Sequence, residues 1–219
     1  MKAVILAAGS LKKAYPVCIT KIGNKTLIEY LVEKLKRIGI NEIGLVIGPE
    51  GEKIKEVLGD SVKYFLQEKP LGTAHAILCA RNFITESNFL VLNSDILFSD
   101  DLSNFSKLKM PTIAAYWVDD TSKYGKLWAK SDKLVEIKEK VPEFTSGLIN
   151  AGIYLFPKDV FELIKKTPLS PRGQYEITDT IKMLIDRGFE FNIHKLNGYW
   201  RDIATAPSSE ISKFFMKKI

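Results

Sequence analysis

The sequence predicts an α/β fold with three layers, in which a mainly parallel sheet carries helices on both faces. In the first half of the chain, short apolar runs typical of buried strands alternate with longer segments of helical periodicity, and turn residues separate them. This alternation is typical of βαβ units, whose right-handed crossovers place helices on both faces of the sheet. A ligand site is expected beyond the carboxyl ends of such strands.

The first half contains four expected strands and three expected helices in alternation. The strands are expected at 3–7, 43–47, 62–66 and 89–92, and the helices at 27–38, 50–58 and 73–80. The helix from Leu27 has the clearest pattern, because apolar residues recur every three or four positions up to Ile38, and Gly39 follows. We expect the chemistry in the segments that follow strands, namely 8–16, 67–73 and 93–96.

The second half changes character, because short strand patterns follow one another with polar turns between them. Strands are expected at 112–118, 125–129, 134–138, 152–156 and 189–195, and helices at 163–166 (the last turn), 175–187 and 207–218. We expect this half to be an antiparallel extension that completes the ligand crevice, and not an independent domain.

Composition places the chain among ordinary globular proteins. It has 219 residues, of which 46% are hydrophobic and 26% charged, and this excludes disordered and collagen-like classes. The apolar run from Ala3 to Leu11 is shorter than the roughly 20 residues that span a bilayer, and we interpret it as a buried first strand and not a signal peptide. No membrane partner is therefore expected.

Charged residues, cysteines and histidines indicate which substrates, compartment and metal sites to expect. The net charge of +6 is spread over lysines that interleave with glutamates, which favours an anionic small substrate over nucleic acid. Two cysteines, Cys18 and Cys79, do not make a disulfide scaffold, so we expect a reducing, cytoplasmic compartment. Two separated histidines, His75 and His194, are too few for a histidine metal site.

Two aspartates are candidates for a metal site. Asp95 directly follows an apolar strand, where a carboxylate faces the crevice and can hold Mg²⁺; the alternative is that it only caps the turn. Asp202 lies between apolar neighbours in the segment 198–203, and the alternative is an ion pair with Arg201. Together the two would form a two-carboxylate Mg²⁺ site for substrate phosphates, since Mg²⁺ usually needs only one or two protein carboxylates.

Two loops are candidates for nucleotide binding. Gly72 lets a flat base approach the backbone, and Thr73 can cap the helix that follows; a plain helix cap is the alternative. The strand-to-loop segment 7–10 can hold phosphates on backbone N–H groups, with charge from Lys12 and Lys13; an ordinary loop between strand and helix is the alternative.

Seven segments in this order resemble the sugar-phosphate nucleotidyltransferases, which make NDP-sugars from a nucleoside triphosphate and a sugar 1-phosphate. The similar segments are 1–9, 22–30, 67–74, 93–95, a group of sugar-side elements at 124–125, 139–140 and 150–152, then 174–179 and 200–203. The resemblance covers nearly the whole chain. It implies a Rossmann-like, three-layer αβα fold with a mixed, mainly parallel sheet, the nucleotide-diphospho-sugar transferase fold.

The resemblance also implies an organisation and a set of site residues. It implies one domain over 1–219, with a nucleotide-binding half at 1–110 and a sugar-binding half at 111–219. Asp95 and Asp202 would hold the Mg²⁺ cofactor, and Lys21 would assist catalysis. The implied nucleotide contacts are Ala7, Ala8, Gly9, Ser10, Lys12, Lys13, Gln67, Pro70, Gly72 and Thr73. The implied sugar contacts are Gly125, Glu139, Lys140, Asn150, Tyr175 and Glu176.

The nucleotide loop departs from the family pattern. Only Ser10 to Tyr15 separate Gly9 from Pro16, no Arg lies among them, and Val17 stands where the family has a Lys. Lys12, Lys13 or Lys21 would have to replace that charge, although Lys lacks the bidentate fork of Arg.

This departure keeps other interpretations open. One is a catalytically impaired or regulatory homologue of the same fold that binds a nucleotide or sugar phosphate. Another is a transferase for a different phosphorylated acceptor, such as phosphocholine or inositol phosphate. The sequence leaves the base and the sugar open, and a homo-oligomer is compatible with it.

Overall fold

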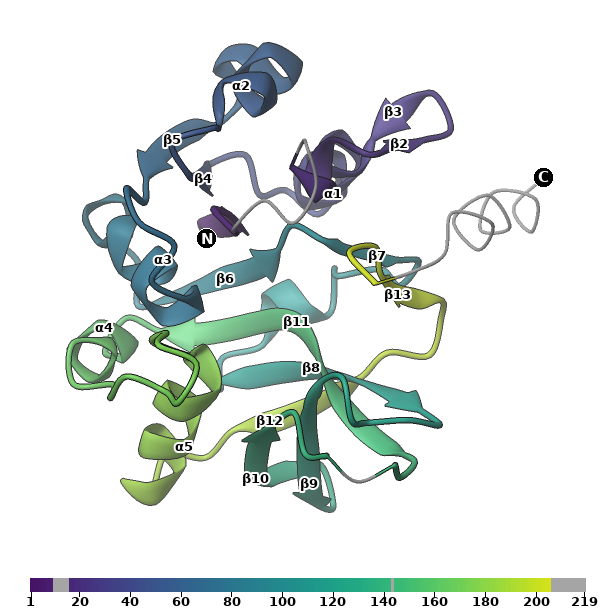
Figure 1. The fold of residues 1–219 in the computed structure, drawn as a ribbon, viewed down its shortest axis with the longest axis vertical. Coiled ribbons are helices and arrows are strands. Elements are labelled where there is room, and N and C mark those ends of the chain that lie inside the picture. The colour runs from purple at the N-terminus through teal and green to yellow at the C-terminus, as the bar shows by residue number, and fades with distance from the viewer. Residues whose placement is uncertain (10–15, 143, 206–219) are drawn as a thin grey trace.

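A nine-stranded mixed sheet runs through both halves of the chain (Figure 1). The computed structural model describes residues 1–9, 16–142 and 144–205. In the order in which they lie in the sheet, its strands are β5 (Lys63–Leu66), β4 (Ile43–Ile47), β1 (Ala3–Ala7), β6 (Asn88–Asn93), β11 (Gly147–Pro157), β8 (Thr112–Val118), β12 (Asn192–Lys195), β10 (Lys133–Glu139) and β9 (Gly125–Lys130). All of them except β11 and β10 point in one direction. The expectation of a mixed, mainly parallel sheet is therefore confirmed.

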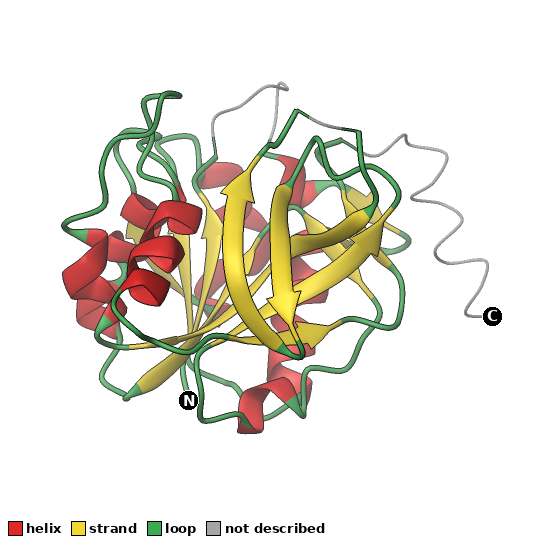
Figure 2. Ribbon diagram, turned by 90° about the horizontal axis from the view of Figure 1, so that it is seen from below, coloured by secondary structure: helices red, strands yellow, loops and turns green. Residues whose placement is uncertain are grey.

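Helices cover both faces of this sheet, as Figure 2 shows. They are α1 (Leu27–Arg37), α2 (Glu52–Leu58), α3 (Thr73–Cys79), α4 (Val160–Ile164) and α5 (Ile177–Asp186). Side chains alternate along β1: Ile5 packs in one buried cluster with Leu31 of α1, whereas Val4 and Leu6 pack in a second cluster with Ile77 of α3. The two clusters on opposite faces of one strand confirm the three-layer αβα arrangement.

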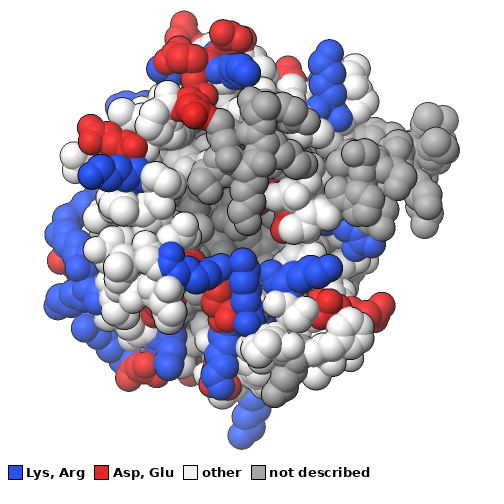
Figure 3. Space-filling model, in the orientation of Figure 1, with Lys and Arg blue, Asp and Glu red and all other residues white. Residues whose placement is uncertain are grey.

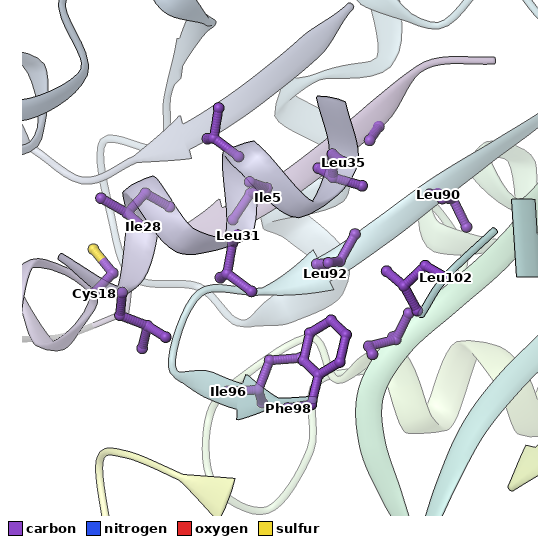
Figure 4. Close-up of a cluster of buried hydrophobic side chains, with 14 of the residues drawn as sticks. Ile5, Cys18, Ile28, Leu31, Leu35, Leu90, Leu92, Ile96, Phe98 and Leu102 are labelled. Carbon is purple, nitrogen blue, oxygen red and sulfur yellow. The ribbon is translucent and has the colours of Figure 1, made fainter. Parts of the chain in front are cut away.

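Helix α1 shows why the local sequence folds as expected. A capping box begins it, since the Thr26 side chain accepts a hydrogen bond from the Glu29 N–H and the Glu29 carboxylate accepts from the Thr26 N–H. Its apolar face then packs on the sheet, where Leu31 and Leu35 lie near Ile5 of β1 (Figure 4).

Most expected elements are found within a few residues of their predicted bounds, and the strands at 43–47 and 112–118 are found as expected. The largest difference is β11, which begins five residues before the expected Gly152. The expected strand starts too late because Asn150 and Gly152 interrupt the apolar pattern of the sequence. At the same place the pairing of β11 with β8 shifts register, between Asn150 and Tyr154. The second half is antiparallel as expected, except that β12 runs parallel to β8. The helix expected at 207–218 lies outside the described residues.

The sequence patterns did not predict several short elements. One small sheet pairs β13 (Trp200–Asp202) with β7 (Ile96–Phe98), and another pairs β2 (Lys21–Ile22) with β3 (Lys25–Thr26). Single 3₁₀ turns are found at Val17–Ile19, Gly59–Ser61, Arg81–Phe83 and Phe105–Lys107. Strands of two or three residues are too short to show a period of two. Among the described helices, none combines the length and the apolar character that a membrane crossing requires.

Candidate active site

A cavity of about 640 Å³ lies at the carboxyl ends of β1, β5 and β6. All three segments expected to carry chemistry contribute to its wall, through residues such as Ala8, Gln67 and Asp95. The second half closes the cavity with residues from β9, β10 and β11 and from the loop before α5. The position agrees with the general rule for open parallel sheets.

Asp95 and Asp202 both line this cavity. Loss of hydration in the cavity wall, followed by the charge of Asp202, raises the pKa of Asp95 to about 6. Loss of hydration also raises the pKa of Asp202, although hydrogen bonds from Ala204 and Thr205 and the charge of Lys140 oppose this. The negative charge of Asp202 therefore acts on Asp95, so the two carboxylates are close enough to interact.

The small β7–β13 sheet brings Asp202 to Asp95. The strands are antiparallel and pair Asp202 with Ile96, and the Ile203 N–H donates to the Asp95 carbonyl oxygen at 2.7 Å. The Trp200 indole N–H donates to the Ala151 carbonyl oxygen at 2.9 Å and anchors β13 to the large sheet. Residues more than one hundred positions apart in the chain are thus held at one site.

The residues at this point fit a hard divalent cation. Beside the two carboxylates, Asn93 ends β6 in the cavity wall, and its buried Oδ1 has no hydrogen-bond partner among the described residues. Oxygen donors and uncompensated negative charge are what Mg²⁺ prefers. No group of three or more His, Cys, Asp or Glu side chains gathers in the described parts of the chain. A Mg²⁺ that also binds substrate phosphates needs no such group.

Two loops form the side of the cavity on which nucleotide contacts are expected. Of the expected nucleotide contacts, the structure places Ala7, Ala8, Gly9, Gln67, Pro70, Gly72 and Thr73 in the cavity wall. Ser10, Lys12 and Lys13 lie outside the described residues. A second cavity of about 240 Å³ shares part of this wall and extends toward Gly48 and Glu50.

Gly72 and Thr73 serve packing as well as the cavity, and for Thr73 this corrects the expected cap of its own helix. Gly72 has φ +105°, and a Cβ there would lie 2.5 Å from the Tyr175 carbonyl oxygen, so glycine is required by a crossing backbone. The Thr73 side chain does not cap its own helix; its Oγ1 accepts a hydrogen bond from the Ile177 N–H at 2.9 Å and thereby caps α5.

Tyr175 is not among the described residues that line the cavity, so the structure does not bring it to the other expected sugar contacts. Its N–H donates to the Leu71 carbonyl oxygen at 2.8 Å, and its carbonyl oxygen accepts from the Ala74 N–H at 2.9 Å. Tyr175 thus joins the nucleotide-side loop to the start of α5 through its backbone.

The other expected sugar contacts gather on the opposite wall, namely Gly125, Glu139, Lys140, Asn150 and Glu176. A Cβ on Gly125 would lie 3.1 Å from Glu139 Oε2 and 3.4 Å from Asn150 Cβ, so the three residues are close neighbours. The Asn150 amide donates to the Tyr154 hydroxyl at 2.8 Å and accepts from the Gly152 N–H at 3.0 Å. Within the described residues, one amide hydrogen of Asn150 has no acceptor and is available to a ligand.

Comparison with known proteins places the chain in a family. A family model described as nucleotidyl transferase matches residues 2–215, which is nearly the whole chain. The chain belongs to the nucleotidyl transferase family. The resemblance deduced from the motifs is therefore confirmed.

Relatives within the nucleotidyl transferase family give a finer picture. The chain is 37% identical over 236 residues to the bifunctional protein GlmU of Methanococcus vannielii, covering 100% of this chain and 56% of that protein. It is 31% identical to a glucose-1-phosphate thymidylyltransferase of Streptomyces antibioticus, covering 92% of this chain and 62% of that protein. The chain therefore spans only about half to three fifths of the length of these relatives.

A solved structure confirms the fold of this nucleotidyl transferase family member. The structure of HddC from Yersinia pseudotuberculosis complexed with GMP-PN superposes with a TM-score of 0.76 at 26% identity, covering 100% of this chain and 99% of that chain. The nucleotide-diphospho-sugar transferase fold implied by the motifs is thus the fold of this chain.

The structure adds a cation that sequence reasoning missed. Arg172 lines the cavity, and its guanidinium lies 2.8 Å from Glu176 and 3.3 Å from Glu139. Burial raises the pKa of Glu139 while Arg172 opposes the rise. Arg172 stands two residues before the quoted segment 174–179, and that proximity was the signal that could have found it.

Lys123 also lines the cavity, together with Lys140 and Arg172. Figure 3 shows a band of Lys and Arg side chains across the middle of one face, beside a hollow in which acidic side chains are visible. Lys21 does not join them: its side chain is exposed on β2 and is not among the described lining residues. The hairpin of β2 and β3 extends away from the body beyond α1 (Figure 1), so the structure does not bring Lys21 to the cavity.

Proposed function

We propose that this family member joins a nucleoside triphosphate to a sugar 1-phosphate, giving an NDP-sugar and pyrophosphate. The observation that carries the proposal is the meeting of Asp95 and Asp202 in one cavity, between the nucleotide-side loops and the sugar-side wall. Residues 1–110 would bind the nucleotide, and residues 111–219 would bind the sugar phosphate. We keep the cytoplasmic location as a prediction.

Asp95 and Asp202 would hold Mg²⁺, with Asn93 beside them. When bound, Mg²⁺ supplies charge neutralisation for the phosphates. Three cations of the cavity wall would attract and orient the two anionic substrates, namely Lys123, Lys140 and Arg172. Glu139 and Glu176 would hold the Arg172 guanidinium and accept hydrogen bonds from sugar hydroxyls.

The reaction is an in-line displacement at the α-phosphorus. A phosphate oxygen of the sugar 1-phosphate forms the new P–O bond, and the bond to the bridging oxygen of pyrophosphate breaks. No protein nucleophile is required, so positioning and electrostatic stabilisation are the catalytic contributions of the chain.

A second candidate function is a binding or regulatory homologue without turnover. The observation that favours it is Val17, which lines the cavity at the position where the family pattern has a Lys. An apolar side chain there provides no charge for the α-phosphate. The cations Lys123, Lys140 and Arg172 lie on the other wall and favour the transferase.

A substrate panel tests the proposal. The protein is mixed with Mg²⁺, each common nucleoside triphosphate and each of several hexose and hexosamine 1-phosphates, and pyrophosphate is measured. We expect release for at least one pair, loss of release with a chelator and recovery with added Mg²⁺. Nucleotide binding without pyrophosphate release for any pair would favour the binding homologue.

A further inference from the structure

Gln67 and His75 form a hydrogen-bonded pair at the nucleotide end of the cavity. Gln67 follows β5 and is only 2% exposed, yet it lines both cavities. Its Nε2 lies 3.1 Å from the Gly72 carbonyl oxygen and 2.9 Å from His75 Nδ1. His75 is half-buried on α3, and its ring is not itself part of the described cavity wall.

The chemistry of these contacts fixes the orientation of the amide. A carbonyl oxygen only accepts hydrogen bonds, so the Gln67 atom that faces Gly72 is the amide nitrogen. The second hydrogen of that nitrogen faces His75 Nδ1. Since Gln67 Nε2 is the donor of this hydrogen bond, His75 Nδ1 must be the acceptor and carries no proton. The neutral ring is then protonated at Nε2.

Cys79 supports this tautomer. Its sulfur lies 3.9 Å from the same His75 Nδ1, one helical turn further along α3. Burial raises the pKa of the Cys79 thiol, so it keeps its proton and acts as a weak donor. Two donors therefore converge on one ring nitrogen.

The arrangement leaves Gln67 one polar atom for a ligand. Both hydrogens of its Nε2 are used within the protein, and no described residue donates to its Oε1. Because Gln67 lines the cavity, its Oε1 is the acceptor that this side chain can offer to a ligand there. A base that presents a ring N–H completes the hydrogen bond, and a base that presents a ring lone pair is repelled.

We propose that His75 is a positioning residue that holds the Gln67 amide with its oxygen available to the base, and that this selects uracil, thymine or guanine over cytosine and adenine. The ring N–H of the first three bases is the donor, whereas cytosine N3 and adenine N1 are acceptors. The inference rests on the proposed function, because it assigns the Gln67 wall to the base of the nucleotide.

Two substitutions separate positioning from mere packing. In His75→Asn the side-chain oxygen takes the place of Nδ1 and still accepts from Gln67, whereas His75→Leu fills the space but offers no acceptor. Without that acceptor only the Gly72 carbonyl oxygen holds the Gln67 amide, so the amide can rotate away from the orientation in which its oxygen is available to the base. His194→Asn is the matched control, because His194 lies on β12 against Phe105 and outside the described cavity wall.

Nucleotide affinity is the first readout. Dissociation constants are measured for UTP, dTTP and GTP and for CTP and ATP, with kcat and both KM values for the best pair of substrates. In His75→Leu we expect the preference for ring N–H bases to fall about tenfold and the KM of the nucleotide to rise, with the sugar-phosphate KM unchanged. His75→Asn and His194→Asn should keep the wild-type preference.

The tautomer is the second readout, and it requires no turnover. A long-range proton–nitrogen spectrum of ligand-free protein carrying nitrogen-15-labelled histidine contains signals of two rings only. His75→Asn removes the His75 signals and so assigns them. We expect an unprotonated Nδ1 and a protonated Nε2 in His75.

The outcomes separate this inference from the proposed function. A wild-type protein that binds no nucleotide overturns both. Two outcomes overturn the positioning role alone, provided that the wild-type protein binds nucleotide and releases pyrophosphate. One is a His75 ring that is protonated at Nδ1. The other is a His75→Leu variant that keeps the wild-type base preference. A wild type that prefers CTP or ATP overturns the base assignment.

Discussion

At the scale of single residues, most of the site residues predicted from the sequence line the cavity, but their packing partners could not be predicted. Asp95 could be predicted because it follows an apolar strand, and Asp202 because it ends a short, largely apolar run. Gly72 was predicted as a site for a flat base, and the structure adds that the Tyr175 backbone lies where a Cβ would be. Tyr175 lies against Gly72, and Glu139 lies against Arg172, although the partners are far apart in the chain. The residues around Gly72 or Arg172 in the sequence give no sign of such a distant partner.

A comparison of two glycines tests the packing of this loop. Gly72→Ala should lower the free energy of unfolding by about 3 kcal/mol, because it combines a left-handed backbone with a clash against Tyr175. Gly173→Ala is the control in the same region. Gly173 has φ +72° but no atom within 4 Å of its Cβ position, so we expect the free energy of unfolding to fall by only about 1 kcal/mol. Urea unfolding of both variants measures the difference, and equal losses would contradict the close contact.

The two thiols test the burial of the cavity wall. Burial raises the pKa of the Cys18 thiol to about 12, and Cys18 is only 2% exposed, whereas Cys79 is half-buried. At about pH 8 the reactive thiolate of Cys18 is therefore scarce, roughly one part in ten thousand. We expect iodoacetamide to modify Cys79 first and Cys18 only after unfolding, as followed by mass spectrometry. Equal rates in the native protein would show that Cys18 is not buried.

At the scale of elements, the short β7–β13 sheet decides the site, and the sequence patterns did not predict it. Each strand has three residues, which is too short to show the alternation of apolar and polar side chains. The sequence therefore suggested Asp202 as a site residue but did not show that β13 pairs with β7 beside Asp95. The turn before β13 is held by Asp100, whose carboxylate accepts from the Asn197 and Gly198 N–H groups at 2.8 and 2.9 Å. Asp100 therefore fixes the strand that carries Asp202 without lining the cavity.

Weakening this turn should affect the metal requirement. Asp100→Asn loses one of the two acceptors, so we expect the Mg²⁺ concentration for half-maximal pyrophosphate release to rise about threefold to tenfold. Asp101→Asn is the matched control, since the neighbouring Asp101 accepts only from Ser103. A titration that shows the same Mg²⁺ dependence in both variants would contradict the positioning of Asp202 by the turn.

At the scale of the whole molecule, the order of layers could be predicted and the order of strands could not. Periodicity indicates strands and helices in alternation, and the handedness of crossovers then gives three layers. The insertion of β11 beside β6, and of β12 between β8 and β10, depends on pairings between distant segments. Those pairings bring the sugar-side wall, carried by β9, β10 and β11, to the carboxyl ends of β1 and β6.

For the whole molecule, we infer that Asp95 and Asp202 hold one divalent cation between the two walls of the cavity. Electron paramagnetic resonance of Mn²⁺, titrated in the presence of a nucleoside triphosphate, measures this directly. We predict that Asp95→Asn and Asp202→Asn each weaken Mn²⁺ binding by more than about tenfold, while Asp60→Asn, on the exposed turn after α2, binds as the wild type does. Wild-type Mn²⁺ affinity in either Asp95→Asn or Asp202→Asn would contradict the account.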